Sequence, residues 1–158
     1  MHNIESTFMK EAIALSVANV ETGKGGPFGA VVVKDGKIIA SAVNQVTASN
    51  DPTAHAEIIA IREACRILNT FSLQGCEIYT SCEPCPMCLG AIYWARPDKL
   101  FYANTKEDAA AIQFNDKFIY EELTKPINDR KLFTRQLLRV EAMDAFKKWE
   151  ASPLKIVY

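Results

Sequence analysis

The apolar positions of the chain follow helical spacing in some stretches and strand spacing in others. In residues 4–20 apolar side chains recur near helical spacing, which predicts a first helix that stops near Gly23. Two runs rich in β-branched residues, 30–33 and 37–43, flank an Asp-Gly pair. Such runs around Asp-Gly predict a β-hairpin.

The two kinds of spacing continue to alternate after the hairpin. Helical spacing returns in residues 53–68 and in residues 85–95, where a proline is tolerated in the first turn. Short apolar runs predict strands over 76–80 and 99–103. The order strand, strand, helix, strand, helix, strand predicts an α/β fold with one sheet covered by helices on both faces.

The pattern loosens after residue 108. We expect one or two short helices up to residue 122, a loop near residues 125–126, and a helix near residues 141–149. The chain shows no repeat and no low-complexity stretch, so residues 1–158 are predicted to form a single domain.

Composition narrows the class of protein. The chain of 158 residues is 49% hydrophobic and 23% charged, as globular domains are. Its formal net charge of -1 provides no basic field for a nucleic-acid partner. No apolar run approaches the roughly 20 residues that cross a bilayer, and the first residues lack the apolar stretch of a signal peptide. We therefore expect a cytoplasmic protein with no membrane partner.

Candidate chemistry is concentrated in two short segments. Three of the five cysteines lie in residues 82–88, and one of the two histidines, His55, lies at the start of a predicted helix. Cys85 and Cys88 are three residues apart near another helix start, which places both sulfurs on one face. One imidazole and two thiolates are three ligands, and a catalytic zinc site leaves its fourth position for water, whose pKa zinc lowers to about 7.

Cysteine spacing alone leaves an alternative open. Cys82 and Cys85 also form a C-x-x-C pair, and a structural site with Cys82 as the fourth ligand would be closed to water. A catalytic site is favoured by Glu57, two residues after His55, together with a later P-C-x-x-C motif. This combination is the signature of zinc deaminases, in which the glutamate is the general acid and base and not a ligand.

These motifs resemble those of a known family. H-A-E at residues 55–57 and P-C-P-M-C at residues 84–88 resemble the cytidine deaminase superfamily, and the likeness covers most of the chain. Four longer stretches resemble its purine branch, the bacterial guanine deaminases: residues 25–33, 49–57, 79–96 and 114–120.

The resemblance implies a fold and a catalytic centre. It implies a three-layer α/β/α fold with a central five-stranded mixed sheet, and Zn²⁺ held by His55, Cys85 and Cys88. Glu57 would be the proton shuttle. Glu141 is a candidate for a second catalytic acid near the leaving ammonia.

The resemblance also implies five contacts to a purine base. Asn44 would form a hydrogen bond with the base, and Phe28 and Trp94 would shape the pocket or stack on the ring. Asp116 would accept hydrogen bonds from N1–H and the 2-amino group of guanine, donors that adenine does not present there. Tyr158 would cap the pocket.

Each of these residues also has a purely structural explanation. Asn44 could end the hairpin strand, and the two aromatic residues could belong to the core. Asp116 could cap the following helix, and Glu141 could be an ordinary charge at a helix N-terminus. Tyr158 could be a disordered chain end.

The resulting hypothesis is hydrolytic deamination of guanine to xanthine and ammonia in purine catabolism or salvage. The resemblance implies a homodimer, and in some members of the family the C-terminal segment, here 141–158, crosses over to complete the neighbour's site. Alternatives are a tRNA adenosine deaminase, a guanosine deaminase, and a zinc-stabilised scaffold protein without catalysis.

Overall fold

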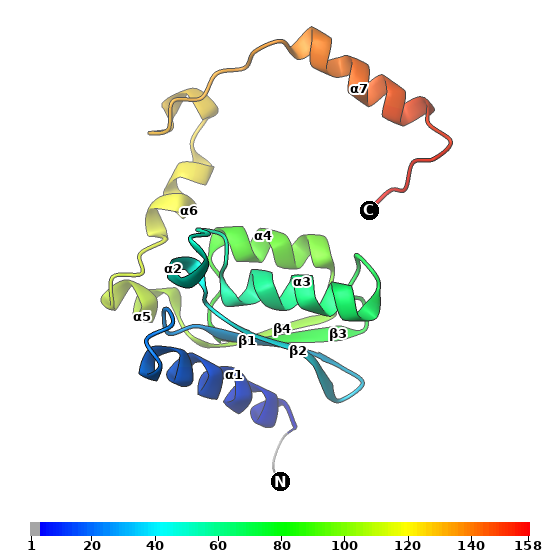
Figure 1. Ribbon diagram of the computed structural model, residues 1–158. Helices are drawn as coiled ribbons and strands as arrows, with labels where there is room; N and C mark the ends of the chain where they lie inside the picture. Colours follow the sequence, from blue (N-terminus) through cyan, green and yellow to red (C-terminus); the bar gives the residue numbers. More distant parts are fainter. Residues whose placement is uncertain (1–3) are drawn as a thin grey trace. The chain divides into compact units, whose positions relative to one another are not determined.

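The computed structural model describes residues 4–158 (Figure 1). It divides into two compact units, residues up to Lys117 and residues 118–158, and each is described by itself. A single domain over residues 1–158 stays a prediction. The first unit contains α1 (Ile4–Glu21), β1 (Gly29–Lys34), β2 (Lys37–Val43), α2 (Val46–Ser49), α3 (Ala56–Leu68), β3 (Cys76–Cys82), α4 (Pro86–Ala95), β4 (Lys99–Asn104) and α5 (Lys106–Ala111).

The sheet of the first unit is mixed. Its strand order is β2-β1-β3-β4; β1 pairs antiparallel with β2 and with β3, and β3 pairs parallel with β4. The α/β class and the mixed sheet are confirmed, but residues 4–158 form four strands and not the five that the resemblance implies. After β4 the chain enters α5 at once, because Thr105 caps that helix in a reciprocal pair of hydrogen bonds with Asp108.

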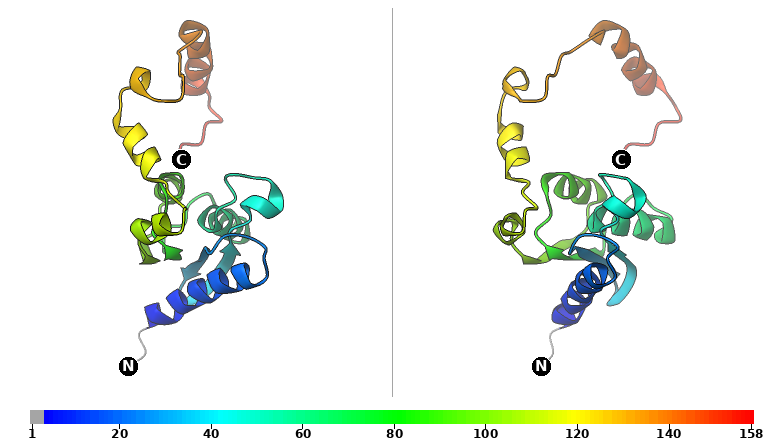
Figure 2. Two further views of the ribbon diagram at one scale, coloured as in Figure 1. Left: turned by 90° about the vertical axis from the view of Figure 1, so that its left-hand side faces the viewer. Right: turned by 60° about the vertical axis from the view of Figure 1, so that its left-hand side comes forward.

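Helices cover both faces of the sheet, which confirms the three layers. Figure 1 shows α1 on one face and α3 and α4 on the other, and Figure 2 shows the same arrangement from two further directions. On the α1 side, the Tyr79 ring stacks on Phe101 and contacts Phe8. On the other side, α3 packs against the sheet through small residues that include Ala56 and Ala60.

The first helix lies very close to the start of β1. A Cβ atom at Gly29 would lie 2.4 Å from the carbonyl oxygen of Ala12, so only glycine fits at this point. The sequence pattern predicts an apolar buried face for α1, yet two of its four buried side chains, Ser16 and Asn19, are polar. The Ser16 hydroxyl donates within the helix to the Ile13 carbonyl oxygen, whereas the Asn19 amide donates to the segment before β1 and to the end of β2.

The second unit consists of helices and irregular chain. It contains most of α6 (Lys117–Thr124), the 3-10 turn η1 (Ile127–Asp129) and α7 (Arg139–Ala151). These positions confirm the predicted short helix, the loop and the last helix. No helix within residues 4–158 is long and apolar enough to span a lipid bilayer.

Candidate active site

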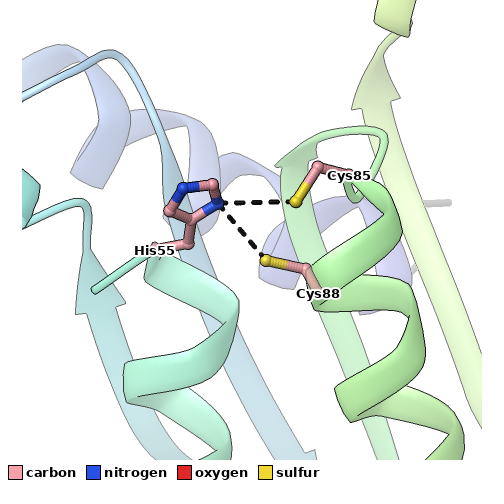
Figure 3. A group of neighbouring side chains, drawn as sticks. All are labelled: His55, Cys85 and Cys88. Atoms are coloured by element: carbon pink, nitrogen blue, oxygen red, sulfur yellow. Dashed lines mark hydrogen bonds between the residues drawn. The ribbon is translucent and has the colours of Figure 1, made fainter. Parts of the chain in front are cut away.

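Two helix starts on the same face of the sheet carry the candidate metal ligands (Figure 3). His55 is the N-cap of α3 and Cys85 is the N-cap of α4, and both have extended backbone angles. The sequence predicts helices from residues 53 and 85. Both helices begin later, at Ala56 and Pro86, because each ligand occupies the non-helical cap position and proline suits the first helical one.

The distances between the three side chains fit a tetrahedral zinc ion. His55 Nδ1 lies 3.6 Å from Cys85 Sγ and 3.4 Å from Cys88 Sγ. Zinc–nitrogen bonds near 2.0 Å and zinc–sulfur bonds near 2.3 Å at tetrahedral angles separate nitrogen from sulfur by about 3.5 Å. Cys82 is engaged elsewhere, since its Sγ contacts the carbonyl oxygen of Thr105 at 3.6 Å. The structure therefore brings together three ligands, as a catalytic site requires.

The protonation of the ligands also suits a cation. Hydrogen bonds from Cys88 and from His55 lower the pKa of the Cys85 thiol to about 4. The contact with Cys85, together with burial, raises the pKa of Cys88. Without a metal the two sulfurs do not both ionise readily, because two adjacent buried thiolates repel each other. A divalent cation offsets this repulsion and lets both sulfurs bind as thiolates.

A buried carboxyl group lies directly beside the ligands. Glu57 is in the first turn of α3, is 7% exposed, and its Oε2 lies 3.5 Å from Cys88 Sγ. Burial raises the pKa of Glu57. A carboxyl group whose pKa is shifted towards neutrality can both accept and return a proton, which is what a proton shuttle requires.

Asn44 and Phe28 lie next to the chain segment that leads to His55. The backbone N–H of Asn44 donates to the Phe28 carbonyl oxygen at 3.1 Å, and the next N–H along the chain donates to the Ala54 carbonyl oxygen at 2.9 Å. Asn44 is 7% exposed, and its Oδ1 accepts a hydrogen bond from the N–H of Val46. The amide is thereby oriented, and Nδ2 is the group left to donate to a ligand.

Asp116 also belongs to this neighbourhood. Two residues before it, the Phe114 ring packs edge-on against Phe28 with centroids 4.9 Å apart. Burial raises the pKa of Asp116, and the charge of Cys85 raises it further, so the carboxyl group lies within electrostatic reach of the ligands. Asn115 Oδ1 accepts a hydrogen bond from the first N–H of α6, which is the capping role that Asp116 could have had.

Three predicted site residues are not brought to the ligands within the first unit. Trp94 follows Cys88 by six residues on α4, which places it about 120° from Cys88 around the helix, and it is 66% exposed. Glu141 lies in the first turn of α7 and Tyr158 is the last residue, and both belong to the second unit. Their roles stay predictions.

Two residues of this neighbourhood are not singled out by the sequence pattern. Asn19 Nδ2 donates to the carbonyl oxygens of Gly26, at 2.8 Å, and of Asn44, at 3.0 Å. A polar residue on the buried face of a helix would signal this role, but the face is known only from the structure. Phe114 belongs to residues 114–120, which resemble the purine branch of the family, but the sequence pattern does not distinguish it from a core residue.

Comparisons with known proteins agree with this geometry. Residues 2–104 match the family model for the "Cytidine and deoxycytidylate deaminase zinc-binding region". The chain is 55% identical over 143 residues to the guanine deaminase of Bacillus subtilis (strain 168), across 90% of this chain and 92% of that protein. It is 47% identical over 96 residues to the tRNA-specific adenosine deaminase of Aquifex aeolicus (strain VF5), across 61% and 63% respectively.

A solved structure shows the same likeness. The X-ray structure of guanine deaminase from Bacillus subtilis superposes with a TM-score of 0.94 at 53% identity, covering 97% of this chain and 98% of that one. The predicted resemblance and the predicted zinc cofactor are confirmed. With its three ligands and its adjacent glutamate in place, the chain belongs to the zinc-binding cytidine and deoxycytidylate deaminase family.

Proposed function

We propose that the chain catalyses the hydrolytic deamination of guanine to xanthine and ammonia. The observation that carries the proposal is the buried carboxyl group of Glu57, 3.5 Å from one member of a three-ligand zinc set. Identity of 55% to a guanine deaminase over 90% of the chain supports guanine as the substrate.

Each residue of the catalytic centre has its own role in the proposed reaction. Zinc bound by His55, Cys85 and Cys88 supplies the Lewis acidity that lowers the pKa of water towards neutrality. Glu57 accepts a proton from the attacking water, passes it to a ring nitrogen, and then transfers a proton to the departing amino group. Carbon 2 of guanine gains an oxygen and loses its amino group, so guanine and water give xanthine and ammonia.

Four side chains are proposed to hold the base. Asn44 donates a hydrogen bond through Nδ2, and the ring of Phe28, supported by Phe114, bounds the purine. Asp116 accepts from N1–H and the 2-amino group of guanine. A base without these donors leaves a partly buried carboxylate unpaired, which disfavours adenine. Trp94 is proposed to stack on the ring.

We propose further that the enzyme works as a homodimer in which the C-terminal segment is exchanged. None of residues 118–158 is buried, and Phe133, Leu154 and Val157 are 86%, 87% and 79% exposed. So much exposed apolar surface is typical of a protein interface. Exchange of residues 141–158 would allow Glu141 and Tyr158 to complete a neighbour's site.

Mixing two defective chains tests the exchange. If Glu57→Ala and Tyr158→Ala dimers are unfolded and refolded together, an exchanged heterodimer has one site with both native residues. Random pairing then restores roughly a quarter of the wild-type activity. Refolded mixtures that stay as inactive as the separate variants would contradict exchange, and light scattering reports whether dimers form at all.

The compartment is proposed to be the cytoplasm. All five cysteines are free thiols in the structure, and two of them must remain reduced to bind zinc. Reducing compartments maintain thiols in this state.

Ammonia release from a panel of substrates tests the proposed function. Guanine, guanosine, adenine, cytosine and an anticodon stem-loop RNA are compared with and without added zinc. We expect zinc-dependent release from guanine. Release of ammonia from the RNA alone would indicate a tRNA adenosine deaminase. Faster release from guanosine than from guanine would indicate a nucleoside deaminase. If no zinc-loaded sample released ammonia, the chain would be a scaffold protein.

A further inference from the structure

One asparagine connects α1 to the two segments that carry the proposed purine contacts. Asn19 is 3% exposed, and its Nδ2 donates to the Gly26 carbonyl oxygen at 2.8 Å and to the Asn44 carbonyl oxygen at 3.0 Å. Gly26 precedes Phe28 by two residues in the loop before β1, whereas Asn44 directly follows β2. A single amide group therefore joins both segments from the opposite side of the sheet to α3.

The two segments can share this donor only because they approach closely. A Cβ atom at Gly25 would lie 2.4 Å from the Asn44 carbonyl oxygen and 2.9 Å from Asn19 Nδ2. Any side chain at Gly25 would therefore separate the loop from the strand end. The 3.1 Å hydrogen bond from the Asn44 N–H to the Phe28 carbonyl oxygen depends on the same approach.

Only one end of the Asn19 amide is used. Its Oδ1 is buried and accepts no hydrogen bond from residues 4–158. The side chain is thus held by its two donated hydrogen bonds. A leucine of similar size would remove these two bonds and no other described polar contact of the side chain. The Asn44 carbonyl oxygen would lose its described donor, whereas the Gly26 carbonyl oxygen would keep only the hydrogen bond from the Phe28 N–H at 2.8 Å.

We propose that Asn19 is a positioning residue for the purine site, which it serves by fixing the Phe28 loop against the Asn44 strand end. The inference rests on the proposed function, because it concerns the two residues assigned to the base. Asn19 does not touch the zinc ligands in any described contact. Its loss should therefore weaken binding of the base and leave the chemical step largely intact.

Asn19→Leu tests the proposal, and Ser16→Ala is the matched control. Ser16 lies on the same buried face of α1, but its Oγ donates only to the Ile13 carbonyl oxygen within the helix. We expect Asn19→Leu to raise KM for guanine about tenfold, to change kcat less than about threefold, and to keep its zinc. Ser16→Ala should keep the wild-type KM and kcat.

A double-mutant comparison separates positioning from general weakening of the fold. In an Asn44→Ala background, Asn19→Leu should raise KM by less than about threefold, because the contact that it orients is already gone. An equal rise of KM in both backgrounds would overturn the proposal, and so would a loss confined to kcat.

Hydrogen–deuterium exchange provides a readout that does not depend on the substrate. Asn19→Leu should speed exchange in residues 25–28 and at Asn44 at least fivefold, and Ser16→Ala should not. Unchanged exchange at these positions would refute the proposal that Asn19 holds the two segments together. Absence of guanine turnover in the wild-type chain would instead refute the proposed function, so the two failures are distinguishable.

Discussion

Replacing Glu57 by glutamine removes the proton shuttle with minimal change in shape. The variant keeps the side chain's length and its place in the first turn of α3, 3.5 Å from Cys88 Sγ. The amide cannot accept a proton from water at neutral pH. The three zinc ligands are untouched, so zinc content should stay at one ion per chain.

The structure allows the size of the effect to be estimated. A positioned general acid or base contributes about 10²–10⁴-fold to the rate, which equals about 2.7–5.4 kcal/mol at 1.36 kcal/mol per tenfold. Glu57 is 7% exposed, so bulk water cannot readily replace it as the proton carrier. We therefore expect kcat to fall by about 10⁴-fold, near the upper end of that range.

The same substitution should not lower the thermal stability of the protein, although it lowers kcat. Burial raises the pKa of Glu57 above its value in the unfolded chain. In the metal-free protein the contribution of Glu57 to the free energy of unfolding is therefore fully present at low pH, and it is lost as the pH rises through the folded-state pKa. Glutamine has no charge to bury, and the metal-free variant should melt at or above the wild-type temperature at pH 8.

Steady-state ammonia release, zinc analysis and thermal melting together test this reasoning. The proposed role requires a large loss of kcat with normal zinc content and an undiminished melting temperature. A variant that keeps more than about a tenth of the wild-type kcat would refute the shuttle, since general catalysis contributes at least about 10²-fold. Loss of zinc from the variant would show that Glu57 helps to bind the metal.

Three further predictions address selectivity, the metal and the packing of α1. Asp116→Asn should reduce the preference for guanine over adenine in kcat/KM at least tenfold and change the melting temperature little; unchanged selectivity would remove Asp116 from the base contacts. Free zinc at about 100-fold above its Kd should raise the melting temperature of the chelator-treated protein by roughly 5–11 °C, and identical melting would argue against a bound metal. Gly29→Ala should destabilise the fold by about 1–3 kcal/mol, because its Cβ would meet the Ala12 carbonyl oxygen, whereas Gly90→Ala meets nothing within 4 Å and should be neutral or stabilising. Equal denaturation midpoints for these two variants would contradict the packing argument.

Local sequence patterns predicted most of the elements because those elements depend on local interactions. The Asp-Gly pair between two β-branched runs predicts the hairpin, and helical spacing predicts α3 and α4. The helix starts were displaced at His55 and Cys85, because an N-cap residue is extended although its neighbours keep the helical spacing. Spacing alone cannot distinguish a cap from a first turn.

The remaining differences arise from contacts that periodicity does not describe. Apolar residues such as Phe133 and Leu154 have the composition of a core and yet are exposed in the chain. No single-chain pattern tells whether a neighbouring copy covers them. The fifth strand was implied by resemblance alone, and no strand of residues 4–158 corresponds to it.

The candidate site was predictable to the extent that short motifs define it. H-A-E and P-C-P-M-C predict His55, Glu57, Cys85 and Cys88, because the chemistry itself fixes those residue types at that spacing. Asn19 was not predictable. Its role depends on which face of α1 is buried, and that face includes polar residues.

The zinc ligands come from two parts of the chain that are 30 residues apart, and β3 lies between them. Cys85 and Cys88 are neighbours even in an unfolded chain, whereas in the folded chain His55 is held 3.6 Å from Cys85 beside a sheet in which β3 pairs with β1 and Val31 lies opposite Tyr79. Closing a loop of this length costs conformational entropy before the contacts between its ends can stabilise it. We therefore expect tight metal binding to be a late event in folding, with a rate that reports the final alignment of the strands.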